Sequence, residues 1–416
     1  MADSLSDSFL KRSAALDASD ADYVIKLVDQ LTLGAREVNA SDIHLLPTAA
    51  GVDLLLRIDG VLQSAGVLPI GLLPNLVARL KHMADMVTYR TDIPQEGRIR
   101  ATNGTGEMRV STYPTFFGEK TVIRFFGGVG RYQRLGDLGM PEEIRQTLFR
   151  LLGETSGAVL IAGPAGSGKT TTLYACLREL LALSGNSRSL ATLEDPIEVV
   201  VSGVAQSQIH TVAGFDLATG LRSMLRQDPE VIALGEIRDH ATAEVALQAA
   251  LTGHLVFSTF HAGSASAVIS RLAGMGIEPY ALSSGIRAIV CQRLVRRLCP
   301  CARPVDDPQH LLGLPVSAAR VPAGCAECRM TGYRGRAVMA EFMLVEQPSI
   351  GDAILSRADR EHLESTARRS GMVTLWERAR VFVEQGITSP AEIRRVLGLT
   401  SRGTVFDDVP PEAPRP

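Results

Sequence analysis

The sequence is poor in cysteine, in aromatic side chains and in net charge. Its 416 residues include six cysteines and one tryptophan, and 43 lysines and arginines nearly balance 45 aspartates and glutamates, for a net charge of −2. A near-neutral chain has no overall field that would draw it onto nucleic acid or an anionic membrane. So few cysteines in so long a chain exclude a small disulfide-stapled domain and favour a reducing compartment. We therefore expect an ordinary folded protein in the cytoplasm.

Long uninterrupted apolar segments are also scarce. Two windows lack charge, 60–78 and 245–270, but the first carries two prolines and the second two histidines. Polar groups of this kind are costly in the core of a bilayer, so both windows are expected in protein cores. The N-terminus shows no apolar segment of signal-peptide length. We expect any association with a membrane to depend on a protein partner.

The first part of the chain predicts a small α+β domain over 21–126, after a flexible leader at 1–20. Asp22–Leu33 has the periodicity of an amphipathic helix. Runs of β-forming residues follow, with Asn103-Gly104 and Phe117-Gly118 as turns. The predicted strands are Val52–Ile58, Arg98–Ala101, Glu107–Tyr113 and Lys120–Phe126.

The second part of the chain has a different pattern. A glycine-rich segment at 127–139 predicts a hinge. From 140 to 400, short β-rich runs alternate with helical patterns, which predicts an α/β fold with a mostly parallel sheet and helices on both faces, a cysteine insertion at 299–328 and a helical end. Residues 401–416 are expected to be a disordered tail. The predicted strands are Ala158–Ala162, Ser189–Leu193, Val231–Leu234 and Leu255–Thr259.

The strongest motif is GPAGSGKT at 163–170, which matches G-x-x-x-x-G-K-[ST] and stands between a predicted strand and a helical pattern. Glycines let backbone N–H groups turn inward around a phosphate, and the helix adds the positive end of its dipole. A chance glycine-rich turn is the alternative. We predict that Lys169 reaches the β- and γ-phosphates and that Thr170 holds Mg²⁺. The predicted nucleotide ligands are Gly163, Pro164, Ala165, Gly166, Ser167, Gly168, Lys169, Thr170 and Thr171.

Acidic residues follow two of the predicted strands. Glu236 stands just beyond Val231–Leu234, and we predict that it contacts Mg²⁺ through water or polarises the attacking water. The segment TLEDPIE at 192–198 adds Glu194 and two further carboxylates. The carboxyl ends of parallel strands face the crevice where ligands bind. An exposed strand-end glutamate at 236 and a solvated turn at 192–198 are the alternatives.

Two histidines flank the predicted strand Leu255–Thr259. His261 follows it, beside the predicted P-loop strand, where a polar side chain can sense the γ-phosphate and pass that state to a neighbouring element. A lone histidine is usually a satisfied core or surface residue, so a functional role is favoured for His261 more than for His254.

Four of the cysteines crowd together as Cys299-Pro-Cys301 and Cys325-Ala-Glu-Cys328. Two such pairs separated by a loop are typical of a closed, structural Cys₄ zinc site. Buried free thiols and a regulatory disulfide are the alternatives.

Three arginines precede the cysteines, at 293, 296 and 297, without interleaved aromatic residues. Aromatic stacking platforms are typical of single-stranded nucleic-acid sites. We therefore expect a solvated or subunit-facing helix surface here and no direct binding of nucleic acid.

Taken in order, these segments resemble the AAA-like traffic ATPases of type II secretion and type IV pilus assembly. The resembling segments are ASDIHLLP (40–47), LRIDGVL (56–62), QEGRI (95–99), RVSTYPT (109–115), GEKTVIR (118–124), GPAGSGKTTTLY (163–174), TLEDPIE (192–198), GLRSMLRQDPE (220–230), ALGEIRD (233–239), GHLVFST (253–259), QRLVRRLCP (292–300), TGYRGR (331–336) and GMVTL (371–375). They extend over about 21–400.

The resemblance implies a P-loop fold of the RecA/AAA-like type, preceded by a small PAS-like domain, in a homohexameric ring that hydrolyses ATP with Mg²⁺. It assigns Lys169, Glu194, Glu236 and His261 to catalysis, the cysteine cluster to zinc, and an inner-membrane platform protein as partner. Arg98, Arg109 and Arg124 match the small domain's arginines, some of which contact the phosphates. Domain rotation coupled to hydrolysis would drive assembly of a pseudopilus or pilus. A non-hydrolysing ring subunit and a DNA-translocating motor are the alternatives.

Three features depart from that family. The chain begins near the small domain, so we expect a short form without the further N-terminal docking domain. Ala262, Gly263 and Ser264 replace the usual Thr-Asn-Asp run after the histidine. The first cysteine pair is one residue tighter than usual. The presence of the cysteine cluster still favours the secretion and assembly branch of the family over the pilus-retraction motors, which lack such a cluster.

Overall fold

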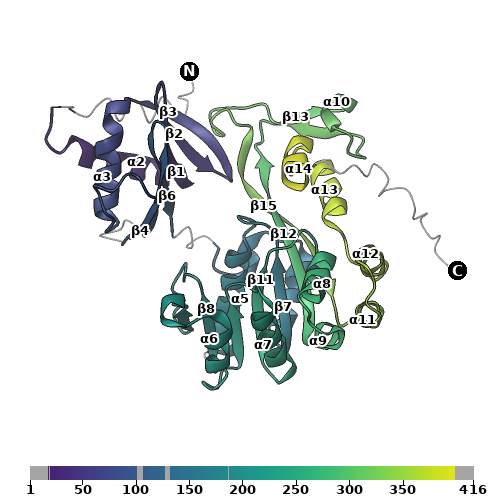
Figure 1. Ribbon diagram of the computed structural model, residues 1–416. Helices are drawn as coiled ribbons and strands as arrows, with labels where there is room; N and C mark the ends of the chain where they lie inside the picture. Colours follow the sequence, from purple (N-terminus) through teal and green to yellow (C-terminus); the bar gives the residue numbers. More distant parts are fainter. Residues whose placement is uncertain (1–16, 18, 101–105, 127–131, 186, 399–416) are drawn as a thin grey trace. The chain divides into compact units, whose positions relative to one another are not determined.

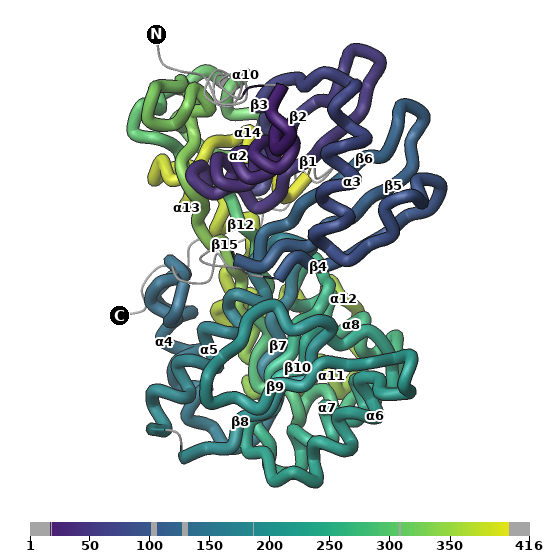
Figure 2. The backbone as a smooth tube through the Cα atoms, turned by 90° about the vertical axis from the view of Figure 1, so that its left-hand side faces the viewer, coloured from purple at the N-terminus to yellow at the C-terminus, as the bar shows by residue number. Residues whose placement is uncertain are grey.

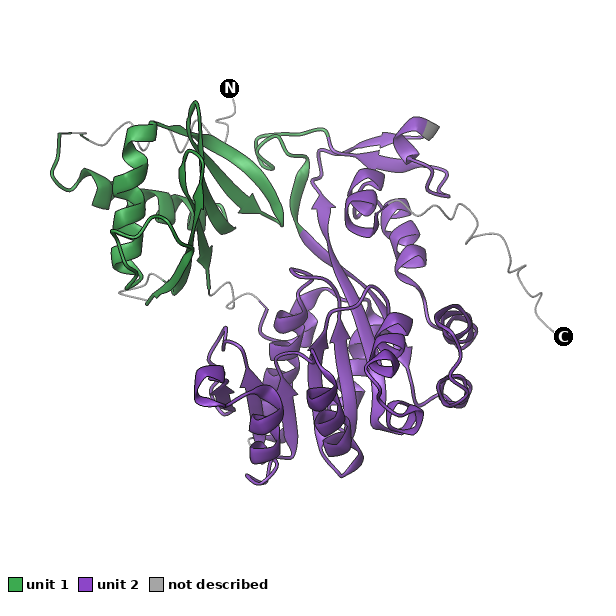
Figure 3. Ribbon diagram, viewed as in Figure 1, with its two compact units in different colours: residues 1–130, 323–335 green, residues 131–322, 336–416 purple. Residues whose placement is uncertain are grey.

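The computed structural model describes residues 17, 19–100, 106–126, 132–185 and 187–398. The predicted tail at 401–416, most of the predicted leader and residues 127–131 of the predicted hinge lie outside the described residues. Contacts divide the chain into unit 1, residues 1–130 with 323–335, and unit 2, residues 131–322 with 336–416 (Figure 3). Residues 323–335, which fall within the predicted ATPase domain, thus group with unit 1.

Unit 1 is an antiparallel sheet with helices on one face (Figure 1, Figure 2). Its six strands lie in the order β3-β2-β1-β6-β5-β4. In β2 the alternation of Val52, Leu54, Leu56 and Ile58 turns one face to the core, because successive side chains of a strand point to opposite faces. The elements are α2 (Tyr23–Glu37), β1 (Ala40–Thr48), β2 (Gly51–Ile58), β3 (Val61–Leu68), η1 (Ile70–Leu72), α3 (Leu73–Met83), β4 (Gln95–Ile99), β5 (Met108–Thr115) and β6 (Gly118–Phe125).

Unit 2 is built on a seven-stranded sheet in the order β15-β12-β7-β11-β10-β8-β9. The pairings of β7 with β11 and β12, and of β8 with β9 and β10, are parallel, as is that of β10 with β11. The strands are β7 (Gly157–Ala162), β8 (Leu190–Glu194), β9 (Ala205–Gln208), β10 (Val231–Leu234), β11 (Leu255–Phe260), β12 (Ile286–Leu298) and β15 (Tyr333–Leu344), with a small hairpin of β13 (Arg303–Val305) and β14 (Ala319–Val321).

Helices cover both faces of this sheet (Figure 1). Val159 and Ile161 of β7 share a core with α5, whereas Ala158 and Leu160 share one with α7, α8 and α9. A strand buried on both faces has to be apolar throughout, as β7 is. The predicted α/β fold is confirmed. The helices are η3 (Leu135–Leu138), α4 (Glu142–Leu151), α5 (Lys169–Ser184), η4 (Thr211–Ala213), α6 (Leu217–Met224), α7 (His240–Leu251), α8 (Ala265–Gly274), α9 (Pro279–Gly285), α10 (Pro308–Leu311), α11 (Pro348–Leu355), α12 (Arg360–Arg369), α13 (Leu375–Glu384) and α14 (Pro390–Leu397).

Two sequence-based expectations differ from the structure. The arginines at 293, 296 and 297 lie on strand β12, so the predicted helix surface is wrong: β12 pairs with β7, and this tertiary pairing decides its conformation. In the predicted hinge, Leu135 and Leu138 of η3 are buried in the core of unit 2. The Leu135 backbone N–H donates to Glu179 Oε2 at 3.3 Å, so this end of the segment is fixed. Among the described helices, none is long and apolar enough to span a membrane.

Candidate functional site

The P-loop connects the end of β7 to the start of α5, as the motif predicts. Gly163 has φ +150°, and a Cβ there would lie 2.6 Å from the Gln292 carbonyl oxygen, so a larger residue would collide with β12. Gly168 has φ +88° and directly precedes α5, whose first turn offers backbone N–H groups and the positive end of the helix dipole. Thr170 is half-buried and Thr171 is exposed. The loop therefore has the local geometry of an anion-binding site.

Lys169 is folded back over this loop. Its Nζ donates to the carbonyl oxygens of Gly163 and Pro164, each at 3.0 Å, and only 8% of the residue is exposed. Burial lowers the pKa of Lys169, and the nearby carboxylate of Glu236 opposes that shift. A buried ammonium hydrogen-bonded to carbonyl groups gains from an anionic ligand, because a phosphate brings further opposite charge close to it.

Glu236 and His261 lie together at the carboxyl ends of β10 and β11. The His261 Nε2 atom is 3.0 Å from Glu236 Oε2, and Arg238 Nε pairs with Glu236 Oε1. The Thr259 hydroxyl donates to the Gly235 carbonyl at 2.6 Å, which fixes the backbone before Glu236. Parallel pairing of the two strands brings these residues together across 25 positions of sequence, and the carboxylate, imidazole and guanidinium form one polar cluster.

Arg238 is a member of this cluster that the sequence analysis did not single out. Its side chain contacts Glu236 and lies 4.0 Å from Asp195, on the neighbouring strand end. The segment ALGEIRD does place a cation two residues after the predicted catalytic carboxylate. This two-residue spacing is visible in the sequence, but it does not show that the two side chains meet. The turn after β10 brings the side chains of Glu236 and Arg238 into contact.

Glu194 lies at the end of β8 and is buried, with 4% of the residue exposed. Its carboxylate accepts from the Thr192 hydroxyl at 2.6 Å, from Gln206 Nε2 at 3.0 Å and from the Tyr174 hydroxyl. Burial raises the pKa of Tyr174, and the bond to Glu194 adds to that shift. The alternative of a solvated turn is therefore wrong for Glu194. The next residue, Asp195, is exposed and is joined to Pro196 by a cis peptide bond.

The three arginines carried over from the family all lie in unit 1, where each pairs with an acid. Arg124 Nε is 2.8 Å from the buried Asp42, Arg98 is 3.4 Å from Glu107, and Arg109 pairs with Glu96. Their side chains are partly exposed. Their contact with phosphates stays a prediction.

The four clustered cysteines have their sulfur atoms within 4.8 Å of one another. Cys325 Sγ and Cys328 Sγ are 3.7 Å apart, close to the edge of about 3.8 Å expected for sulfurs around a tetrahedral Zn²⁺. The backbone N–H groups of Cys325 and Gly332 both donate to Cys328 Sγ, at 3.1 and 3.2 Å, and such bonds stabilise a thiolate. This donor set fits a structural zinc ion, and the short C-x-C spacing does not prevent the sulfurs from converging.

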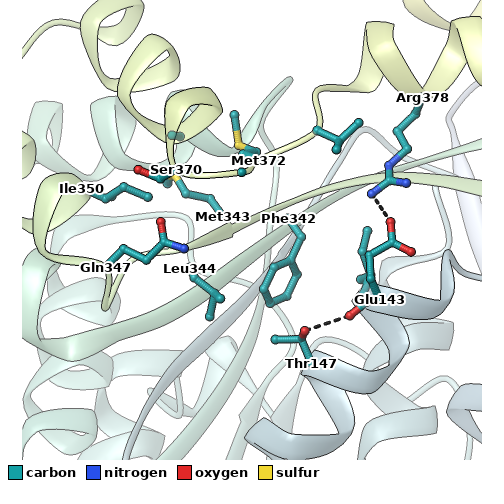
Figure 4. Close-up of a pocket in the computed structure, with 14 residues that line it drawn as sticks. Glu143, Thr147, Phe342, Met343, Leu344, Gln347, Ile350, Ser370, Met372 and Arg378 are labelled. Atoms are coloured by element: carbon teal, nitrogen blue, oxygen red, sulfur yellow. Dashed lines mark hydrogen bonds and ion pairs between the residues drawn. The ribbon is translucent and has the colours of Figure 1, made fainter. Parts of the chain in front are cut away.

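A pocket elsewhere in unit 2 contains none of the predicted site residues. It lies between α4, β15 and the helices that follow, where Arg378 pairs with Glu143 beside Phe342 (Figure 4). The P-loop and the Glu236 cluster, which lie at the carboxyl ends of β7, β10 and β11, therefore remain the candidate site.

Several known proteins resemble this chain in sequence. The family described as Type II/IV secretion system protein matches residues 17–395. A type II secretion system protein E from Klebsiella pneumoniae is 39% identical over 391 residues, which cover 92% of this chain and 77% of that protein. The type IV pilus assembly ATPase TfpB of Acinetobacter baylyi is 37% identical over 397 residues, which cover 92% and 67%.

A solved structure also resembles this chain. The ATPase DotB of Legionella pneumophila matches it with a TM-score of 0.66 over 88% of this chain and 94% of that one, at 23% identity, so the likeness concerns the fold. The family match confirms the resemblance inferred from the motifs and the ATPase class that it implied. The chain belongs to the type II/IV secretion system protein family.

Proposed function

We propose that this chain hydrolyses ATP to ADP and phosphate, and that a homohexamer of it powers assembly of a type II secretion pseudopilus or a type IV pilus. The observation that supports hydrolysis most is the Glu236–His261 pair, 3.0 Å apart, at the strand ends beside the P-loop. A carboxylate held this way is suited to orient and polarise an attacking water.

Each of the other predicted site residues has its own role in this proposal. Lys169 and the N–H groups of the first turn of α5 bind the phosphates, and Thr170 would hold Mg²⁺, which neutralises phosphate charge when bound. His261 senses the γ-phosphate through Glu236, and Glu194 holds the neighbouring strand end. Arg98, Arg109 and Arg124 approach the phosphates when the small domain closes, so hydrolysis drives rotation of the small domain. The motor acts in the cytoplasm and reaches the inner membrane through a platform protein.

The proposal is tested by steady-state phosphate release from the purified chain with Mg²⁺ and ATP, over a range of protein concentrations. We expect turnover that rises as hexamers form. Release at background level would instead favour a non-hydrolysing ring subunit. Stimulation by DNA with a steep dependence on salt would favour a translocase, because binding to phosphate backbones releases counterions.

We also propose that the cysteine cluster holds one structural Zn²⁺. Freshly reduced protein is expected to contain one zinc per chain, and a chelator that removes it should lower the melting temperature, because binding to the folded site stabilises the folded state. Cys328→Ser should lose the metal, whereas Cys176→Ser, at a buried thiol outside the cluster, should retain it. Less than stoichiometric zinc in the reduced wild type would contradict the proposal.

A further inference from the structure

Strand β12 places a fully buried glutamine beside the P-loop. Gln292 has 0% of its surface exposed, and it follows Cys291, which pairs with Ala162 at the end of β7. Parallel register thus sets Gln292 level with Gly163, the first residue of the loop. The close approach of the Gln292 carbonyl to Gly163 follows from this register.

The side-chain amide of Gln292 makes hydrogen bonds to both the loop and the helix that follows it. Nε2 donates to the Ser167 carbonyl at 2.7 Å, and Oε1 accepts from the Thr172 hydroxyl at 3.0 Å. A buried amide costs free energy unless both its donor and its acceptor are satisfied, so this arrangement determines which way the amide points. Gln292 therefore joins the last turn of the loop to the first turn of α5.

The bond to Ser167 affects the direction of a phosphate-binding group. In a trans peptide the C=O and the following N–H point in opposite directions. Because Gln292 holds the Ser167 carbonyl toward β12, the Gly168 N–H is turned away from β12 and into the loop. Inward-facing N–H groups of this kind make a P-loop an anion site.

The next residue of β12 extends this support to the histidine side of the site. Arg293 donates from Nη1 to the Gln292 carbonyl at 3.0 Å and from Nη2 to the Gly263 carbonyl at 2.7 Å. Gly263 lies two residues after His261. The buried guanidinium of Arg293 therefore holds the backbone of Gln292. It also holds the backbone that follows His261, the proposed sensor of the γ-phosphate.

We infer that Gln292 is a positioning residue for nucleotide binding: it orients the Ser167–Gly168 peptide so that the P-loop is preformed for phosphate. The inference rests on the proposed function only in taking ATP as the ligand. It gives Gln292 no contact with the reacting atoms. Loss of the amide is expected to weaken binding, because part of the binding free energy must then order the loop.

The test compares Gln292→Leu, which keeps the volume and removes both hydrogen bonds, with the wild type. We expect the Kd for a fluorescent ATP analogue to rise about tenfold, since two buried bonds are lost. KM should rise with it, and kcat should change less. Gln248→Leu, at an exposed position of α7, is the matched control and should bind as the wild type does.

A purely structural role predicts a different result. It would lower the melting temperature of Gln292→Leu but leave the Kd of the folded fraction unchanged, and that outcome overturns the inference. If Gln292→Leu does not fold, the Kd values of Thr172→Val and Thr172→Ser are compared instead. Thr172→Val removes the hydroxyl and should weaken binding, whereas Thr172→Ser keeps it and should not. Equal Kd values for the two variants would contradict the inference. Because Kd is measured without turnover, a wild type that binds but does not hydrolyse ATP would refute the proposed function alone.

Discussion

Replacing Glu236 by glutamine is expected to lower steady-state ATP hydrolysis by about 10²- to 10⁴-fold, the contribution typical of a general base. Glutamine keeps the shape of the side chain but cannot accept a proton from water. Lys169 and the P-loop remain intact, so the Kd for ATP should change little. Phosphate release and binding of a fluorescent ATP analogue, measured on the same sample, separate the two effects.

The control for this substitution is Glu244→Gln. Glu244 lies on α7 with 64% of its side chain exposed, and its contact with His240 is an exposed pair of the kind that contributes little. It should hydrolyse ATP at the wild-type rate. If Glu236→Gln retained more than about a tenth of wild-type activity, well outside the range for a lost general base, Glu236 would not be the catalytic carboxylate.

A second large effect is expected at Glu392, on stability rather than on turnover. Glu392 on α14 is fully buried, and its carboxylate accepts from Arg296 Nη2 at 2.7 Å and from Arg395 Nε at 2.8 Å. It also accepts from the Arg296 backbone N–H at 2.9 Å, which joins α14 to β12. Removing one partner of a buried ion pair leaves the other charges uncompensated, so Glu392→Gln should lower the free energy of unfolding by about 3–5 kcal/mol.

Acid should have a similar effect on the wild type. Burial alone would raise the pKa of Glu392, but hydrogen bonds from Arg395 and Arg296 outweigh it and hold the pKa below its ordinary value. The unfolded chain then binds more protons than the folded chain as the pH falls, so this contribution is present above the ordinary glutamate pKa of about 4.3 and is lost below it.

Denaturant unfolding of the wild type and of Glu392→Gln, at neutral and at acidic pH, measures both effects. The difference between the two proteins should shrink as the pH falls through the folded pKa of Glu392. Glu384→Gln on α13 is the control, because Glu384 is 44% exposed and only 3.9 Å from Arg380, an exposed pair that contributes little. Equal stability of wild type and Glu392→Gln at neutral pH would show that this contact does not hold α14 in place.

Local patterns in the sequence were enough to predict the strands that carry the site. The predicted strand 158–162 is observed as β7, Gly157–Ala162, and the predicted strand 231–234 as β10 with the same bounds. These segments are buried on both faces, and their unbroken apolar character is visible without any knowledge of their neighbours. The prediction of a strand failed at β12, which carries charged side chains. Its arginines pair with groups that are distant in the sequence, such as Glu392 and the Gly263 carbonyl.

The sequence by itself determined the P-loop, the buried strands that precede the site residues and the presence of clustered cysteines, because each depends on residues that are close together in the chain. Only the tertiary structure decided that Glu194 is buried, that Arg238 joins Glu236 and His261, and that Gln292 holds the loop. The physical reason is that a buried polar group is defined by its partner, and Gln292 finds its partners in Ser167 and Thr172, 125 and 120 residues away.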